Sequence, residues 1–330
     1  MALVAEIRRT HRLNGPDREK LWKLSEMAAR FPEAGAGAMS FLRLDLPPAL
    51  REPLLDFAEG SSPHGHLLLR GLDVGDVPPT PAGQDTAALD GHPTDGTLTL
   101  VADLLGSLVG YQDEKSGALI HDVHPVPGEE TRIENSGSVA FDFHTENVHH
   151  PLRPDFLGLL CLRRDHDGVA ATRVASVREA IAHLTPEDVA ALRRPVYHSA
   201  YPSSFTRDTA AGPPPLAGPH PVIFGDPDRA FLRFNSHHTR AADTRGTRAL
   251  DALARALETV CQDIVLEPGD LVIVDNHVAA HGRSAFAPRY DGADRWLRRF
   301  YSLRSTPLWA RRMMRRPRVI PRMADIRGVV

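Results

Sequence analysis

A histidine and a carboxylate stand two positions apart in the segment FDFHTENVHH, residues 141–150. The apolar residues of this segment are typical of a β-strand, on which side chains alternate between two faces. His144 and Glu146 would therefore point to one side of a sheet, and Phe141 and Phe143 to the other. An imidazole and a carboxylate that converge in this way could hold a metal ion. One strand supplies only two such ligands, so a third must come from elsewhere in the fold.

The best source of a third ligand is the segment GDLVIVDNHVAAHGRSAF, residues 269–286, where an apolar run ends in a turn with His277 and His281. Two histidines and one carboxylate on one face of an octahedron hold non-haem Fe(II) and leave three positions open. Open positions are what oxygen chemistry requires. Zn²⁺ accepts the same ligand types, so the composition of the set does not separate the two metals.

Simpler interpretations of these histidines stay open at this point. A lone His-x-Glu pattern also occurs in many proteins that bind no metal. His149 and His150 are predicted to cap the end of the strand or to face solvent ahead of Pro151. His277, beside Asn276, could simply satisfy hydrogen bonds of the turn. The spacing alone therefore makes a metal site one hypothesis among several.

The elements that must position these residues are mostly short strands. From about residue 137 onward, β-rich runs alternate with turn residues, a pattern typical of a barrel or jelly roll. Helices are expected near 176–193 and 246–261. Upstream, we expect a helix over 16–31 that packs through Leu21, Leu24, Met27 and Ala28, a second helix over 46–60, and a buried strand and turn over 66–74.

Two segments, 76–97 and 206–228, are rich in turn-forming residues and are predicted to be long loops. Loops longer than about 12 to 15 residues in a compact domain are usually functional or mobile. We therefore expect these segments to act as lids that exclude water from a reactive site.

Composition limits the class of protein. The chain has 330 residues, 42% hydrophobic and 25% charged, and a formal charge of −3, which gives no overall attraction to nucleic acid or membranes. Cys161 and Cys261 form no spacing motif, and a reducing cytoplasm fits them. The first residues carry no apolar core of signal-peptide length, and no run approaches the roughly 20 apolar residues of a membrane span. We expect a cytoplasmic protein.

Longer stretches carry a family resemblance. FDFHTENVHHPLRPDFLGLLCLRRD, followed by EPGDLVIVDNHVAAHGRSAFAPRYDGADRWLRRFY, resembles the clavaminate synthase-like group of Fe(II)/2-oxoglutarate oxygenases, which includes the free asparagine and arginine 3-hydroxylases. The match runs from about GYQDEKSGALIHDVHPVPGEE to residue 305. It implies a β-rich α+β fold with a double-stranded β-helix (jelly-roll) core and flanking helices. It also implies one oxygenase domain over 1–330, with mainly helical additions over 1–100, the core with a helical insert over 101–305, and a basic extension over 306–330.

The resemblance implies a ligand set and a chemistry. His144, Glu146 and His281 would hold Fe(II), and His277 falls outside the pattern. With 2-oxoglutarate and O₂ as co-substrates, the enzyme would release succinate and CO₂ and insert an oxygen atom into an unactivated C–H bond. The cavity must then be dry and must hold the target carbon firmly.

Two arginines are expected to hold carboxylates. A guanidinium pairs with a carboxylate in a planar, bidentate way that an ammonium cannot match. By resemblance, Arg295 binds the far carboxylate of 2-oxoglutarate with Thr172 as a hydroxyl partner, and Arg299 binds the α-carboxylate of an amino-acid substrate. On a strand, Arg295 and Arg299 face the same cavity. Arg298, between them, is predicted to face solvent.

The substrate is the least determined part of the expectation. By resemblance, Gln112 and Glu146 would meet the α-amino group of the substrate. Relatives that accept arginine carry acids in the segment that corresponds to FLRFNSHHTRA, where this chain has Asn235, Ser236 and His237. An unpaired buried cation costs several kcal/mol, so this difference argues against arginine and for a neutral polar or an anionic side chain. Asp243 could still supply an acid.

We therefore predict hydroxylation of a free L-amino acid at C3. The alternatives with the same cofactors are desaturation, ring closure, or an amino acid held on a carrier protein. A third class, a non-catalytic or nucleic-acid-associated protein, is suggested by WARRMMRRPRVIPRM near the C-terminus. In a chain this rich in arginine, a solvated extension or one packed over the barrel explains the run better, and no nucleic-acid partner is expected.

Overall fold

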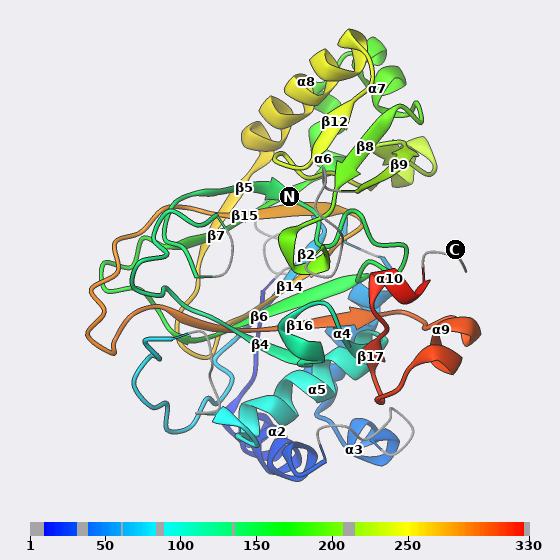
Figure 1. The fold of residues 1–330 in the computed structure, drawn as a ribbon. Coiled ribbons are helices and arrows are strands. Elements are labelled where there is room, and N and C mark those ends of the chain that lie inside the picture. The colour runs from blue at the N-terminus through cyan, green and yellow to red at the C-terminus, as the bar shows by residue number, and fades with distance from the viewer. Residues whose placement is uncertain are drawn as a thin grey trace.

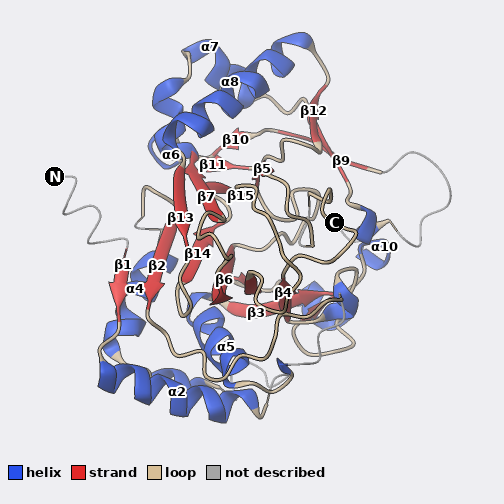
Figure 2. Ribbon diagram, turned by 90° about the vertical axis from the view of Figure 1, so that its left-hand side faces the viewer, coloured by secondary structure: helices blue, strands red, loops and turns tan. Residues whose placement is uncertain are grey.

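Two β-sheets lie one above the other at the centre of the computed structural model (Figure 1). The structure describes residues 10–31, 39–60, 62–83, 89–133, 136–206 and 215–326. Helices gather at both ends of the stacked sheets, as the second view also shows (Figure 2). The predicted sheet-rich α+β class is confirmed.

The larger sheet has the strand order β1-β2-β14-β6-β16-β3-β17, and β4 also pairs with β16. Its central strands β14, β6 and β16 are antiparallel neighbours. The region expected to be mainly helical therefore contributes two strands, β1 and β2. The strands are β1 (Thr10–Arg12), β2 (His66–Arg70), β14 (Leu271–Asp275), β6 (Phe156–Arg163), β16 (Trp296–Leu303), β3 (Ser107–Tyr111), β17 (Val319–Ile320) and β4 (Ile120–Val123).

The smaller sheet is antiparallel throughout and has the order β13-β7-β15-β5. Strand β15 lies between β7 and β5, which places His281 directly opposite His144. Two short sheets, β12-β8-β9 and β10-β11, complete the strands. The bounds are β13 (Gln262–Val265), β7 (Ala171–Ser176), β15 (Ala279–Arg283), β5 (Phe141–His144), β12 (Thr239–Ala241), β8 (Tyr197–Ala200), β9 (Leu216–His220), β10 (Ile223–Phe224) and β11 (Phe231–Leu232).

The helices cover the outer faces of the two sheets. In Figure 1, α2, α3 and α5 lie below the larger sheet, α6, α7 and α8 lie above the smaller one, and α9 and α10 lie at one side. Helix α4 packs with the same apolar residues as α2 and α5. Their bounds are α2 (Gly15–Ala29), α3 (Ser40–Leu44), α4 (Pro48–Ala58), α5 (Pro93–Leu105), α6 (Val177–Ala180), α7 (Pro186–Leu192), α8 (Thr244–Val260), α9 (Leu308–Met313) and α10 (Met323–Ile326).

Strand β6 is buried on both faces, which explains its continuous apolar sequence. Phe156 and Leu160 pack with the apolar residues of α2, α4 and α5. Leu157 and Leu159 pack in the core that lies between the two sheets. Because side chains alternate along a strand, position parity decides whether a residue meets the helices or the space between the sheets. The same rule applies to β16.

Helix α2 begins as the sequence predicts, because the Asn14 side chain accepts a hydrogen bond from the Asp17 backbone N–H at 2.8 Å. Its predicted packing face is partly wrong. Met27 is 46% exposed, whereas Ser25 is buried and bonds to Thr97 of α5. Met27 lies about 100° around the helix from Ala28, outside the stripe that contacts α5.

The two predicted long loops are shorter than expected. Helix α5 begins at Pro93, inside the segment 76–97, and His92 caps it. Strands β9 and β10 lie inside the segment 206–228. Residues 84–88 and 207–214 lie outside the described part of the chain, so a lid role for either segment stays a prediction.

The arginine-rich C-terminal segment packs against the rest of the chain. Strand β17 extends the larger sheet by pairing with β3. Arg318 binds Asp103 of α5 through both Nη atoms, at 2.7 and 2.8 Å. The segment is therefore anchored to the rest of the chain through β17 and Arg318, whereas Arg311, Arg312, Arg315 and Arg316 are exposed. Among the described residues, no helix is long and apolar enough to span a bilayer.

Candidate metal centre and its cavities

The structure brings together the side chains of His144, Glu146 and His281. One Glu146 carboxylate oxygen, Oε2, lies 3.4 Å from His144 Nε2 and 3.5 Å from His281 Nε2. All three side chains are buried, and their ligand atoms lie within 4.8 Å of one another. A single ion placed between these atoms could contact all three.

The route by which Glu146 reaches this point differs from the prediction. Strand β5 ends at His144, so Glu146 lies in a turn instead of continuing the strand. The Asn276 side chain, fully buried, accepts the Glu146 N–H at 2.6 Å and donates to the Glu146 carbonyl at 3.1 Å. Asn276 thus fixes the turn, a role that the sequence did not reveal.

Both imidazoles direct their Nε2 atoms at Glu146 Oε2. His144 Nδ1 donates to the Asp142 carbonyl at 3.1 Å, which leaves Nε2 unprotonated and directed at Glu146. Burial and the neighbouring His144 lower the pKa of His281 to about 4, so its imidazole is neutral. Between His281 and Arg283, a Cβ at Gly282 would lie 2.4 Å from the Phe141 carbonyl oxygen. Only glycine lets β15 approach β5 this closely.

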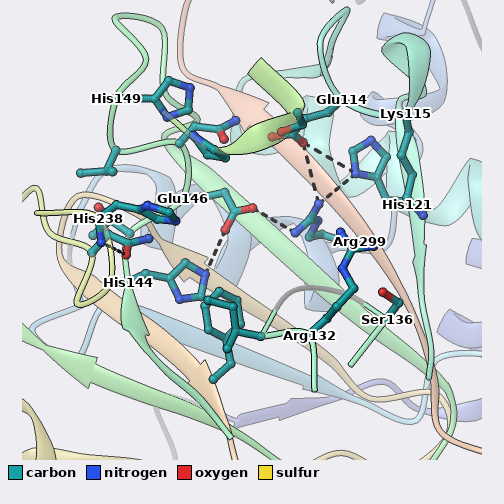
Figure 3. Close-up of a pocket in the computed structure, with 18 of the residues that line it drawn as sticks. Glu114, Lys115, His121, Arg132, Ser136, His144, Glu146, His149, His238 and Arg299 are labelled. Carbon is teal, nitrogen blue, oxygen red and sulfur yellow. Dashed lines mark hydrogen bonds and ion pairs between the residues drawn. The ribbon is translucent and has the colours of Figure 1, made fainter. Parts of the chain in front are cut away.

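Glu146 is held as a carboxylate. Burial alone would raise its pKa, but the nearby positive charge of the Arg299 guanidinium opposes burial, and the pKa lies well below its usual range. Its second oxygen, Oε1, accepts from Arg299 Nη1 at 2.9 Å and from the Tyr301 hydroxyl. Figure 3 shows Glu146 between His144 on one side and Arg299 on the other.

The donor set fits an open metal site better than a closed one. Within the described residues, this group contains three ligands and no fourth histidine, cysteine or acid. Structural zinc sites use four protein ligands, whereas non-haem iron sites of this composition keep positions open. His277 lies outside the group, since its Nε2 is 2.8 Å from Asp155 Oδ1 and its Nδ1 accepts from Arg153 at 2.6 Å.

Two cavities meet at this centre. The smaller, about 60 Å³, is lined by both histidines, Thr172 and Arg295, and Arg295 Nη2 donates to Thr172 Oγ1 at 3.5 Å. The larger, about 180 Å³, is lined by His144, Glu146 and the residues drawn in Figure 3. Arg299 borders both cavities. One metal ion could therefore be reached from two binding spaces.

The sequence matches the family model for the taurine catabolism dioxygenase TauD, TfdA family over residues 43–301. The chain belongs to this family. Membership confirms the predicted resemblance and the predicted enzyme class, a 2-oxoglutarate-dependent non-haem iron dioxygenase.

Several relatives in this family are similar over nearly the whole chain. The L-asparagine oxygenase of Streptomyces coelicolor is 39% identical over 305 residues, which are 90% of this chain and 88% of that protein. Clavaminate synthase 2 of Streptomyces clavuligerus is 34% identical, with 87% and 90% covered. A crystal structure of asparagine oxygenase with Fe(II), (2S,3S)-3-hydroxyasparagine and succinate has a TM-score of 0.87 at 34% identity, and the match covers 95% of this chain and 99% of that chain.

In this TauD-family chain, Arg298 is buried, and the prediction that it faces solvent is wrong. Its parity on β16 turns it toward α5, where it contacts Asp95 at 2.5 Å, and it also contacts Asp122 of the neighbouring strand β4 at 3.3 Å. Arg299 turns the other way, and its Nη2 lies 3.0 Å from His121 Nδ1 and 3.8 Å from Glu114 Oε2. The sequence did not show that a helix would cover the second face of this strand.

We expect Arg298→Met to destabilise the protein by about 3 kcal/mol, because it leaves two buried carboxylates without their guanidinium. Burial raises the pKa of Asp95 to about 6, so at pH 7.5 this carboxyl is ionised and needs its partner. Urea unfolding at pH 7.5 measures the decrease in the free energy of unfolding. Arg289→Met, which removes an exposed contact with Asp167, is the control and should cost less than about 1 kcal/mol. Equal losses in the two variants would contradict this account.

His149 and His150 are also buried, contrary to the prediction. The His149 ring packs against Tyr201 and Phe205, with ring centroids 4.7 and 4.3 Å apart, and the His150 ring lies 5.0 Å from that of Tyr111. Burial lowers the pKa of both, that of His150 to about 3, so both are neutral. Aromatic residues distant in sequence cover this turn, which spacing alone could not show.

Several predicted substrate residues fall in different places. Asn235 lines the larger cavity, but His237 does not, and its neighbour His238 does. Gln112 lies outside the lining, and Glu114, two residues further, is part of it. Burial raises the pKa of Glu114 to about 7, although Arg299 opposes the shift. The segment QDEK therefore offers Glu114 as a further candidate beside Gln112, whose role stays a prediction.

Asp243 does not supply an acid to the cavity. Its carboxylate caps α8 by accepting the Gly246 N–H at 2.7 Å, and it binds Arg194 at 2.6 Å. The acid that would pair with a cationic substrate side chain in this segment is therefore missing from the described lining of the larger cavity near Asn235.

Proposed function

We propose that this enzyme hydroxylates a free L-amino acid at C3, with Fe(II) as cofactor and with 2-oxoglutarate and O₂ as co-substrates. The observation that carries the proposal is the pair of cavities that share one cluster of two imidazoles and one carboxylate. We also take the chain to be one oxygenase domain over 1–330 whose facing sheets form a double-stranded β-helix.

His144, Glu146 and His281 would hold the iron. Iron with 2-oxoglutarate supplies the activation of O₂ for attack on a C–H bond, with succinate and CO₂ as by-products. Arg295 and Thr172 would bind the far carboxylate of 2-oxoglutarate in the smaller cavity. Arg295 is 5% exposed and forms no ion pair with a carboxylate among the described residues. A buried, unpaired guanidinium of this kind is expected to bind an anionic ligand.

The larger cavity suits the head group of an amino acid. Arg299 offers a guanidinium for the α-carboxylate, and Glu114 and Glu146 offer carboxylates for the α-amino group. These groups lie close to the proposed iron, so C3 is the side-chain carbon nearest to it. An amino acid held as a thioester on a carrier has no free α-carboxylate to pair with Arg299. This favours a free substrate.

Asn235 indicates what kind of side chain fits. Its Oδ1 accepts the backbone N–H groups of His237 and His238, both at 2.9 Å, which leaves its Nδ2 donor for the cavity. A donor at this place suits an amide or carboxylate oxygen and not a cation. We therefore expect an L-amino acid with a short amide or carboxylate side chain.

A panel assay tests this function. The iron-loaded enzyme is incubated with 2-oxoglutarate and each of the common L-amino acids, and succinate and product masses are measured. We expect an amide or acidic amino acid to gain one oxygen atom with matching succinate. A product that has lost two hydrogens would mean desaturation or ring closure instead. Turnover only with a carrier-bound amino acid would contradict the free substrate.

Glu114→Gln should raise the KM for the amino acid by roughly 10- to 100-fold, because a charge-assisted bond to the α-amino group becomes neutral. The affinity for 2-oxoglutarate should stay unchanged. Gln112→Ala is the matched control, since Gln112 does not line the cavity. If Gln112→Ala raised KM and Glu114→Gln did not, Gln112 and not Glu114 would bind the α-amino group.

A further inference from the structure

Three arginines line the smaller cavity, and for one of them, Arg283, the sequence suggested no role. Arg283 lines it together with Arg295. Both side chains are buried, at 7% and 5% exposure. Within the described residues, neither forms an ion pair with a carboxylate, so two like charges share a small space without a counter-charge.

The strand register places Arg283 beside the group proposed for the co-substrate. Arg283 follows His281 by two positions on β15, so both point to the same face of the sheet. Across the sheet, Arg283 pairs with Thr172 of β7, the same threonine whose hydroxyl accepts from Arg295. The guanidinium carbons of both arginines also lie over the Phe286 ring, 5.6 and 5.9 Å from its centre.

The hydrogen bonds of Arg283 are incomplete. Its Nη2 donates to the Val139 carbonyl at 2.8 Å, and no residue in the described part of the chain accepts a hydrogen bond from its buried Nε. A structural guanidinium in the same chain looks different, since Arg318 binds Asp103 through two Nη atoms. A buried cation with unmet donors costs stability unless a ligand completes it. The buried guanidinium of Arg283, with donors that lack an acceptor among the described residues, is therefore suited to bind an anionic ligand.

We propose that Arg283 is a second binding residue for the distal carboxylate of the 2-oxo acid co-substrate. That carboxylate would lie between the guanidinium groups of Arg283 and Arg295, with the Thr172 hydroxyl as a third donor. A carboxylate has about four lone-pair sites and can accept from all of these groups at once. The inference rests on the proposed function. It implies strong selection for 2-oxo acids that carry a second carboxylate.

Two 2-oxo acids distinguish a binding role of Arg283 from a structural one. 2-Oxoglutarate and 2-oxopentanoate have the same carbon chain, but the second lacks the distal carboxylate. Each is titrated into the anaerobic Fe(II) enzyme, and the visible charge-transfer band is followed. Arg283→Met should weaken 2-oxoglutarate by roughly 10- to 100-fold, the usual range for a hydrogen-bonded charge, and leave the affinity for 2-oxopentanoate unchanged. Arg173→Met on the neighbouring β7, which removes contacts with Glu258 and Asp263, should change neither.

The melting temperature of the metal-free, ligand-free protein gives an independent readout. A structural role for Arg283 predicts a lower melting temperature in Arg283→Met and an equal loss of affinity for both oxo acids. A binding role predicts an unchanged or higher melting temperature, because a buried charge has been removed. If Arg283→Met fails to fold, Arg283→Lys replaces it and should still weaken only 2-oxoglutarate.

Equal weakening of both oxo acids, or unchanged affinity for 2-oxoglutarate, would overturn the role of Arg283. Absence of the band in the wild-type enzyme would contradict the proposed function instead. The two failures are thus distinguishable in one experiment.

Discussion

A His281→Ala variant is expected to lose its iron and with it product formation. The ligand atoms of His144, Glu146 and His281 lie within 4.8 Å of one another, and no fourth candidate within the described residues joins this group to replace a missing one. Loss of an outer-shell partner costs about 10- to 100-fold in metal affinity, so loss of a direct ligand should cost more than about 100-fold. Iron per chain after anaerobic reconstitution and gel filtration measures this directly.

His277→Gln is the control, because His277 lies four residues before His281 and binds Asp155 and Arg153 instead of facing the cluster. This variant should keep one iron per folded chain, even if its melting temperature falls. Iron retained by His281→Ala, or lost from His277→Gln at full folding, would contradict the proposed ligand set.

The second large effect is expected at Arg295. Arg295→Met should weaken 2-oxoglutarate by more than about 100-fold, because the distal carboxylate would then enter a buried cavity without its main counter-charge, a loss of about 3 to 5 kcal/mol. The charge-transfer band should still form at high co-substrate concentration, since the iron ligands are intact. Titration of the anaerobic Fe(II) enzyme with 2-oxoglutarate gives the affinity.

Arg164→Met is the control for Arg295, because Arg164 forms an exposed contact with Glu267, 2.7 Å away, outside both cavities. It should bind 2-oxoglutarate like the wild type. An Arg295→Met variant with normal affinity would show that the co-substrate binds elsewhere.

The strand pattern and its motifs could be predicted from the sequence because they depend on local order. Alternation along FDFHTE and the apolar run LVIVD indicate strands whatever they pack against. The sequence could not show that β15 pairs with β5, so His281 as the third ligand depended on the family resemblance. The structure brings it opposite His144 through pairing between residues more than 130 positions apart.

The predictions of exposed side chains were wrong where an element distant in sequence covers one face of a strand or turn. Arg298 has the spacing of an exposed strand residue, yet α5, about two hundred positions earlier, covers that face and supplies Asp95. His149 and His150 follow a strand end, yet Tyr201 and Phe205 enclose them. Sequence periodicity gives the direction of a side chain and not what lies in that direction.

Residues that act through geometry were also missed. Arg283 follows the predicted ligand His281 by two positions, so strand alternation alone predicts that the two side chains point to the same face. The amide of Asn276 holds the turn that carries Glu146, and the position of Asn276 beside His277 does not indicate this role. Both roles depend on hydrogen-bond partners that lie far away in sequence.

Iron binding by His144, Glu146 and His281 is tested by titration of the metal-free protein with Fe(II) under anaerobic conditions, at saturating 2-oxoglutarate. We expect a visible charge-transfer band that grows linearly and saturates at one Fe(II) per chain. A folded protein that forms no such band would contradict iron binding at this cluster.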